Sequence, residues 1–190
     1  MGYTTDFEGD IEIKEPLTPE QVEYINLVAR TRRMKRDVNK LMELYKGEYG
    51  NPFAKDKTNP DEVYGFEGEF FAREDGNSGQ SEDASIIEFN TPAGQVGFMQ
   101  GEVDKGQPGL WCGWEVSENG TALRWDGGEK FYNYVAWMKY LIKKFFIPWG
   151  RKLNGEIYWY GEDREDIGKI KVKDNEVEVF DGEIRYEGDE

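Results

Sequence analysis

Residues 110–146 read LWCGWEVSENGTALRWDGGEKFYNYVAWMKYLIKKFF, and this stretch decides the fold. Apolar side chains alternate with other residues over positions 110–116 and again over 121–125, which is typical of half-buried β-strands. The sequence Ser-Glu-Asn-Gly at 117–120 lies between them, and its Asn-Gly pair suits the positive φ angles of a tight turn. The stretch therefore begins with a predicted β-hairpin.

The second half of the stretch predicts an amphipathic helix over residues 131–145. Asp126 and Glu129 have the spacing of a capping box at its start, and Pro148 and Gly150 end it. The side chains of its apolar face are Phe131, Tyr134, Val135, Met138, Leu141, Ile142 and Phe145. We expect this face to pack on the sheet to which the hairpin belongs.

Residues beyond the helix predict further strands. One strand begins at Ile157 and Trp159, and a β-meander follows it. The meander is indicated by apolar pairs at 170 and 172, 177 and 179, and 184 and 186, with turns at Asp174-Asn175 and Asp181-Gly182.

The N-terminal 46 residues also predict regular structure. Apolar residues of one parity indicate a half-buried strand over 7–13. A helix is expected after Thr18, because its hydroxyl and the Gln21 side chain can form a capping box around Pro19. A second, shorter helix is expected from the cap Asp37 to Gly47.

The segment 47–108 has a different composition, with frequent Gly, Asn, Asp and Ser. Between positions 61 and 104 it carries 11 acidic residues and one basic residue, Arg73. Two short strands are predicted there, at Phe66–Ala72 and Ser85–Phe89. Because structureless loops of this length are uncommon inside compact domains, the segment is interpreted as a loop-rich acidic insertion.

The order of these elements predicts an α+β fold, with a small, mostly antiparallel sheet and two main helices, in a single domain over 1–190. Without the insertion at 47–108, the order is β-α-β-β-α-β, which is that of the ferredoxin-like split βαβ fold. The C-terminal meander is an addition to that order.

Composition excludes several classes of protein. The 190 residues include 39 acidic and 24 basic side chains, which gives a net charge of −15. There is no His and one Cys, so an internal disulfide and a zinc site built on Cys and His are excluded. No apolar run is long enough to span a membrane, and no leader is evident, so we expect a cytoplasmic protein.

Candidate catalytic and metal-binding residues are few. Cys112 shares its strand face with apolar residues, which indicates a buried and unreactive thiol. The acids at 162–166 could serve a glycosidase but are expected to form a solvated turn. The oxygen-rich loop at 74–83 lacks the order of an EF-hand. No phosphate-binding loop occurs, so no cofactor, metal or catalytic residue is assigned.

A partner-binding surface is the more favoured kind of site. Arg30, Arg32, Arg33, Lys35 and Arg36 form a basic cluster, which we expect to pair with acids of the insertion rather than with DNA. Trp, Tyr and Arg dominate protein–protein hot spots. The candidate partner-binding residues are therefore Trp111, Trp137, Tyr140, Trp149, Arg32 and Arg33. The alternative is that the insertion at 47–108 covers one of the faces that carry these aromatic residues.

Several segments together resemble a family of bacterial and bacteriophage proteins that has no assigned activity. They are GYTTDF at 2–7, GQPGLWC at 106–112, WDGGEKFY at 125–132, PWG at 148–150 and LNGE at 153–156. This chain departs from the family pattern at Gly113, where a polar residue such as Gln is expected. The resemblance implies a phage or prophage origin and no catalytic residue.

The leading hypothesis is a non-enzymatic protein-binding module that acts in the cytoplasm and contacts neither membrane nor nucleic acid. One version is a DNA mimic, whose acidic side chains imitate phosphates and occupy a DNA-binding protein. One alternative is a carboxylate-based hydrolase, with or without a divalent cation, which requires acids from distant segments to converge. The other alternative is a structural phage component.

Overall fold

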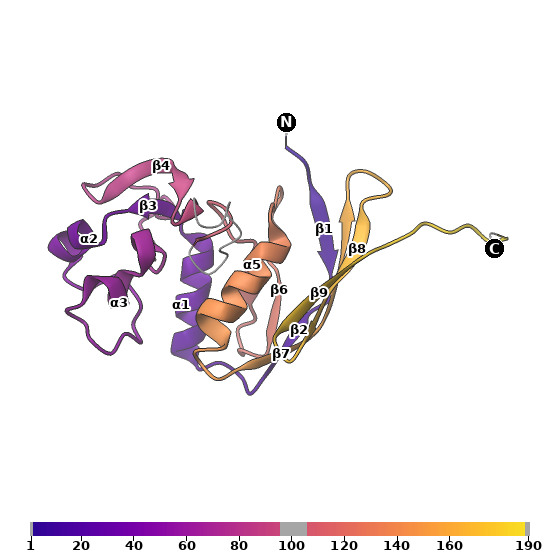
Figure 1. Ribbon diagram of the computed structural model, residues 1–190, viewed down its shortest axis with the longest axis horizontal. Coiled ribbons are helices and arrows are strands. Elements are labelled where there is room, and N and C mark those ends of the chain that lie inside the picture. Colours follow the sequence, from indigo (N-terminus) through magenta and orange to yellow (C-terminus); the bar gives the residue numbers. More distant parts are fainter. Residues whose placement is uncertain (1, 96–105, 189–190) are drawn as a thin grey trace.

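The computed structural model describes residues 2–95 and 106–188 (Figure 1). Most strands join one antiparallel sheet, whose order is β5-β6-β2-β7-β8-β9, with β1 also paired to β7. The strands of this sheet are β1 (Thr5–Glu8), β2 (Ile11–Lys14), β5 (Trp114–Val116), β6 (Ala122–Trp125), β7 (Lys152–Gly161), β8 (Ile167–Lys173) and β9 (Glu176–Asp181).

This order confirms the α+β fold and its β-α-β-β-α-β arrangement. The first strand, β2, lies between β6 and β7, while β5 lies outside β6, and all of these pairs are antiparallel. That order and pairing are those of the split βαβ fold. Strands β8 and β9 extend the sheet beyond β7 as a meander.

The predicted N-terminal strand is divided into β1 and β2, and the two residues between them, 9 and 10, are not part of either strand. Glu8 lies opposite Tyr158 and Ile11 opposite Gly155, so β1 and β2 follow β7 in one register. Gly9 has a φ of +106°, and a Cβ atom there would lie 2.5 Å from the carbonyl oxygen of Glu156. Glycine is therefore required where the two strands meet.

Two helices cover one face of the sheet (Figure 1). Helix α1 (Pro19–Arg30) begins with the predicted Thr18–Gln21 capping box. Helix α5 (Tyr134–Leu141) continues as a π-helical turn, η2 (Ile142–Phe146). The largest core cluster lies between these helices and the sheet, and it includes Ile11, Ile13, Val28, Leu123, Met138, Leu153, Ile157 and Ile170.

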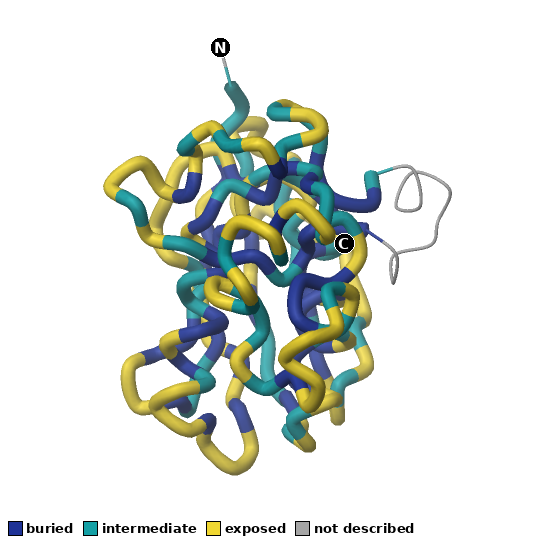
Figure 2. The backbone as a smooth tube through the Cα atoms, turned by 90° about the vertical axis from the view of Figure 1, so that its left-hand side faces the viewer, coloured by how far each residue is buried: buried dark blue, intermediate teal, exposed yellow. Residues whose placement is uncertain are grey.

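The insertion forms a lobe of its own on the far side of the helices. It contains α3 (Pro60–Tyr64), the 3₁₀ turn η1 (Phe66–Gly68) and β4 (Ile86–Pro92). Strand β3 (Met34–Arg36) pairs with β4, and α2 (Val38–Tyr45) packs on α3 and η1. Leu41, Ala54, Val63, Tyr64 and Phe71 form its separate buried cluster. Figure 2 looks onto this lobe, whose outer loops are exposed.

Several sequence-based boundaries are wrong, and β7 begins at Lys152 rather than at Ile157. Residues 110–113 lie outside β5, and the predicted strand Phe66–Ala72 contains the 3₁₀ turn η1 instead. Helix α5 begins at Tyr134 rather than at 131. The later start of α5 has a local cause. The Asp126 side chain accepts a hydrogen bond from the backbone N–H of Gly128 in a tight turn, so it caps no helix.

The predicted fourth strand of the meander, at 184–186, is also absent from the described residues. A two-residue turn at 181–182 requires Phe180 to exchange backbone hydrogen bonds with Glu183. However, the backbone N–H of Gly182 donates to the carbonyl of Ile167 on the β8 side. Because hydrogen-bonded pairs recur at every second residue of an antiparallel ladder, the N–H and C=O groups of Phe180 also point towards β8, at Lys169. The chain therefore leaves β9 without turning back.

Candidate protein-binding surface

Three of the predicted partner-binding residues lie in the interior, so the expectation that they are at the surface is wrong. The side chains of Trp137, Tyr140 and Arg33 are 0%, 1% and 2% exposed. Helix α5 packs on the sheet, and the hydroxyl of Tyr140 contacts Glu69 and Gln107 of the insertion. The alternative interpretation, that the insertion covers one of these faces, holds for Tyr140, which contacts Glu69 and Gln107.

Arg33 and Tyr140 belong to a buried polar network that fastens the insertion to α5. Arg33 donates to the carbonyls of Phe71 and Glu69 and to the side chain of Gln107. Tyr140 donates to Oε1 of Glu69, and Lys144 lies 3.4 Å from the same oxygen. Burial lowers the pKa of Arg33, and burial together with the Glu69 carboxylate raises that of Tyr140. These contacts are structural.

Trp149 is half-buried and has partners within the chain. Its ring centroid lies 5.5 Å from that of Phe53 and 5.6 Å from that of Phe145. These ring contacts join the end of η2 to the insertion, and the one with Phe53 is edge-to-face.

Arg32 and Trp111 are the predicted residues that reach the surface. Trp111 is 40% exposed. The Arg32 guanidinium carbon lies 4.3 Å from the ring centroid of Phe89 and 5.9 Å from that of Trp111. Arg32 also donates to the carbonyl of Phe89 and to Asn90. The stack forms a small surface patch, while burial lowers the pKa of Arg32.

The rest of the basic cluster is neutralised by the insertion, as the sequence predicts. Arg36 lies 3.0 Å from Asp83 and Lys35 lies 3.1 Å from Glu67. Arg30 makes a longer, exposed contact of 3.9 Å with Glu74. The cluster is therefore used within the chain.

Cys112 is buried, as predicted. Burial raises the pKa of its thiol to about 12. A thiolate is the reactive form of cysteine, so this residue is poorly suited to nucleophilic chemistry.

The two acidic loops also have structural roles. Burial opposes ionisation of Asp75, but hydrogen bonds from Ser81, Asn77 and Gly79 outweigh it and lower the pKa of Asp75 to about 2. At the β7–β8 turn, Asp166 accepts hydrogen bonds from Tyr3 and from the indole of Trp159. The solvated-turn interpretation is thus incomplete for Asp166. Within residues 2–95 and 106–188, no group of three or more acids or thiols could hold a metal ion.

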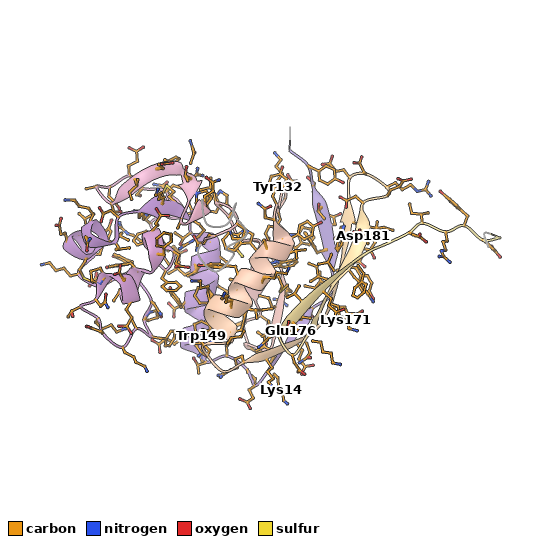
Figure 3. All side chains as sticks on the ribbon, in the orientation of Figure 1. Lys14, Tyr132, Trp149, Lys171, Glu176 and Asp181 are labelled. Atoms are coloured by element: carbon orange, nitrogen blue, oxygen red, sulfur yellow. The ribbon has the colours of Figure 1, made fainter. Side chains whose placement is uncertain are left out.

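The surface that the sequence did not reveal is the open edge of the sheet at β9. Five of its six residues are exposed, and the side chains of both parities reach solvent. Strand β9 lies at this edge because a two-residue turn pairs it directly with β8. The turn residues Asp174 and Asn175 have the positive φ values, 45° and 73°, that such a turn requires. Figure 3 shows Glu176 and Asp181 at the two ends of this strand.

An aromatic hollow of about 320 Å³ lies on the outer face of the sheet beside β9. The helices cover the opposite face, so the side chains of Tyr158, Tyr160 and Phe180 are exposed here. The Lys169 ammonium lies 5.6 Å from the Phe180 ring centroid and 3.2 Å from Glu156. These side chains form what we call the outer hollow.

A second hollow, of about 580 Å³, lies on the inner face, between the start of α5 and β9. Its lining combines the apolar residues Val135, Ala136, Trp159 and Val179 with the charged residues Lys139, Asp166 and Asp181. Burial, with Asp166 and Asp181 adding to it, raises the pKa of Tyr134 to about 12, so its hydroxyl stays protonated. We call this space the inner groove. Strand β9 thus has a hollow on each side.

The polar backbone groups of β9 alternate in direction. Because Gly182 bonds to Ile167, Phe180, Glu178 and Glu176 direct their N–H and C=O groups at β8. Val177, Val179 and Asp181 therefore direct theirs away from the sheet. An extended chain alongside β9 could bond to these groups.

The comparisons with known proteins add nothing to this picture: no family model, curated protein or solved structure matches the chain. In the described part of the chain, no helix has the length and apolar character needed to cross a membrane.

Proposed function

We propose that this protein is a binding module that recognises another protein through the β9 edge of its sheet. The observation that carries the proposal is an edge strand with five exposed residues of six, with the outer hollow on one face and the inner groove on the other. Such an edge offers unpaired backbone groups, and the adjoining hollows can select side chains.

The contacts of the acidic side chains favour this function over a carboxylate-based hydrolase. That alternative requires acids of distant segments to meet in one cleft. Asp126 and Glu129 line one hollow and Asp163 lines another, while the Glu162 carboxylate accepts the N–H of Thr4. Asp166 and Asp181 both line the inner groove, but Asp166 is engaged by hydrogen bonds from Tyr3 and Trp159. The DNA-mimic version gains little support, because Glu67 and Asp83 of the insertion are paired with basic residues.

The resemblance to bacterial and bacteriophage proteins supports a cytoplasmic setting in a bacterial or phage-infected cell. It is consistent with a small adaptor or inhibitor, for which no catalytic residue is required.

Site-specific photocrosslinking tests the proposal. A photoreactive phenylalanine analogue replaces Phe180, at the β9 edge, or Tyr132, which is similarly exposed but lies before α5. In bacterial lysate we expect one discrete adduct from position 180 and none of that size from 132. The same adduct from both positions, or none from position 180, would contradict binding at this edge.

A further inference from the structure

Given the proposed function, we infer that the partner segment is an extended strand of alternating basic and apolar residues, which adds to β9 as the next strand of the sheet. The inference rests on the backbone of β9, on the side chains of its two faces, and on the registers that other occupants would need.

The backbone sets where the partner strand bonds. Val177, Val179 and Asp181 direct their N–H and C=O groups away from β8. These groups recur at every second residue, which is the spacing that an added strand requires. The addition of a strand extends the ladder without disturbing the pairs between β8 and β9.

The inner face sets the apolar positions of the partner. Residues opposite Val177 and Val179 would direct their side chains to the same face, towards the inner groove. That groove presents Val135 and Ala136 of α5. An aliphatic side chain there would bury surface that Val179, at 45% exposed, leaves open to water.

The outer face sets the charged positions. Lys171 and Lys173 of β8 lie opposite Glu178 and Glu176 of β9. Charge thus alternates from one strand to the next, and opposite charges stabilise cross-strand pairs. A lysine or arginine opposite each glutamate continues this alternation, whereas an acidic residue there would be repelled. The net charge of −15 also steers a basic segment towards the molecule.

Self-association through β9 fits less well. If two copies paired edge to edge through β9, the residues whose N–H and C=O groups point away from β8 would have to lie opposite one another. Of the two antiparallel registers with the largest overlap, one sets Glu178 against Glu178 and the other sets Val177 against Asp181. The chain's own tail is a poor occupant as well, because the backbone of Phe180 is already bonded to β8 and prevents a tight turn.

Peptide binding tests the inference. The probe is a peptide of alternating lysine and valine matched in length to β9, and the control peptide has the same composition in two blocks. We expect the alternating probe alone to protect the amide hydrogens of Val177, Val179 and Asp181 from exchange, while those of Glu178 and Phe180 keep the protection they already have. Equal binding of the block peptide would show attraction by charge alone and would overturn the inference.

Two variants sharpen the test. Val179→Pro removes an outward N–H without touching the β8 ladder, and we expect the affinity to fall about tenfold or more. Ile184→Pro, in the tail beyond β9, is the matched control and should bind normally. A double variant, Glu176→Lys with Glu178→Lys, should lose the lysine–valine peptide and gain a glutamate–valine one. If the double variant still preferred the lysine–valine peptide, the placement of basic partner residues opposite Glu176 and Glu178 would be wrong. This test does not depend on the stability of Val179→Pro.

The outcomes separate this inference from the proposed function. If position 180 crosslinks a partner that Val179→Pro still captures, strand addition is wrong but protein binding at this edge stands. If position 180 crosslinks nothing and no peptide binds, both fail. An acidic peptide that binds to the unchanged protein, or a dimer that forms through β9 and excludes the probe, would overturn the basic partner.

Discussion

Arg33 shows how a residue that looks like a binding residue can serve the interior. It lies in a run of basic residues, and nothing in that run marks it as different from Arg32. The structure separates them, because Arg33 bonds to buried carbonyls while Arg32 stacks on surface rings. A single sequence gives no signal for this, since the carbonyls come from the distant insertion.

Arg33→Met is therefore expected to be far more damaging than the matched change Arg32→Met. Removing the guanidinium leaves the buried Phe71 carbonyl without its donor and leaves the Glu69 carbonyl with the Gln107 amide alone, and we expect a loss of about 3–5 kcal/mol in the free energy of unfolding. Arg32→Met should cost about 1 kcal/mol or less. Urea unfolding of both variants measures the difference, and equal losses would contradict the role assigned to the network.

Cys112 gives a second prediction at this scale. With a pKa raised to about 12, the thiol is almost wholly protonated at neutral pH, and it is also buried. We expect a thiol reagent to label the native protein at least about 100-fold more slowly than the urea-unfolded chain. Labelling at similar rates in the two states would show that the thiol is accessible.

Among the elements, those with complete local signals were predictable. Helix α1 has both halves of its capping box, and α2 has its Asp37 cap. Helix α3 was missed although Asn59 and Pro60 give the same kind of signal. The predicted strand at 184–186 failed for a different reason, because its apolar pattern says nothing about which way the backbone of Phe180 is bonded.

The burial of candidate site residues was likewise not predictable from the local sequence pattern. Trp137 and Tyr140 flank the apolar stripe of α5, and such positions face solvent when a helix packs on one layer only. Here Glu69 and Gln107 of the insertion contact Tyr140, so this flanking position is buried as well. The β9 edge could be found only once the end of the meander was known.

Met138→Asp is expected to be among the most damaging single changes in α5. Met138 is fully buried between the helix and the sheet, and an unpaired carboxylate there should cost about 3–5 kcal/mol. Lys139→Asp, at the exposed neighbouring position, is the control and should change stability by about 0.5 kcal/mol or less. Thermal unfolding followed by circular dichroism compares them, and an unchanged transition in Met138→Asp would contradict the packing of α5.

For the whole molecule, we expect stability to fall in alkaline solution. Burial raises the pKa values of Tyr24, Tyr140, Tyr134 and Cys112 in the folded protein. Above about pH 9 the unfolded chain loses these protons first, so it binds fewer protons than the folded state, and the free energy of unfolding decreases as pH rises towards 12. Urea titrations between pH 7 and 11 measure the slope. Tyr134→Phe should make the decrease of the unfolding free energy with pH less steep. If that pH dependence did not change, the raised pKa of Tyr134 would be contradicted.

The distribution of charge predicts that free DNA does not bind. Lys35 and Arg36 are paired with acids of the insertion, and the chain has a large excess of negative charge. A gel-shift titration at ~150 mM salt, where charges beyond about 8 Å are screened, should show no complex with duplex or single-stranded DNA. Micromolar binding that disappears in Arg30→Glu plus Arg32→Glu would place the protein among nucleic-acid binders.

The central position of β2 determines when the protein can fold during its synthesis. Ile11 pairs with Gly155, a residue 144 positions later in the chain. At roughly 5–20 residues per second, the ribosome makes that partner roughly 7–30 s after the first strand. The apolar side chains of β1 and β2 remain without their sheet for this interval. A nascent chain that stops before β7 keeps them exposed and becomes a substrate for chaperones and proteases.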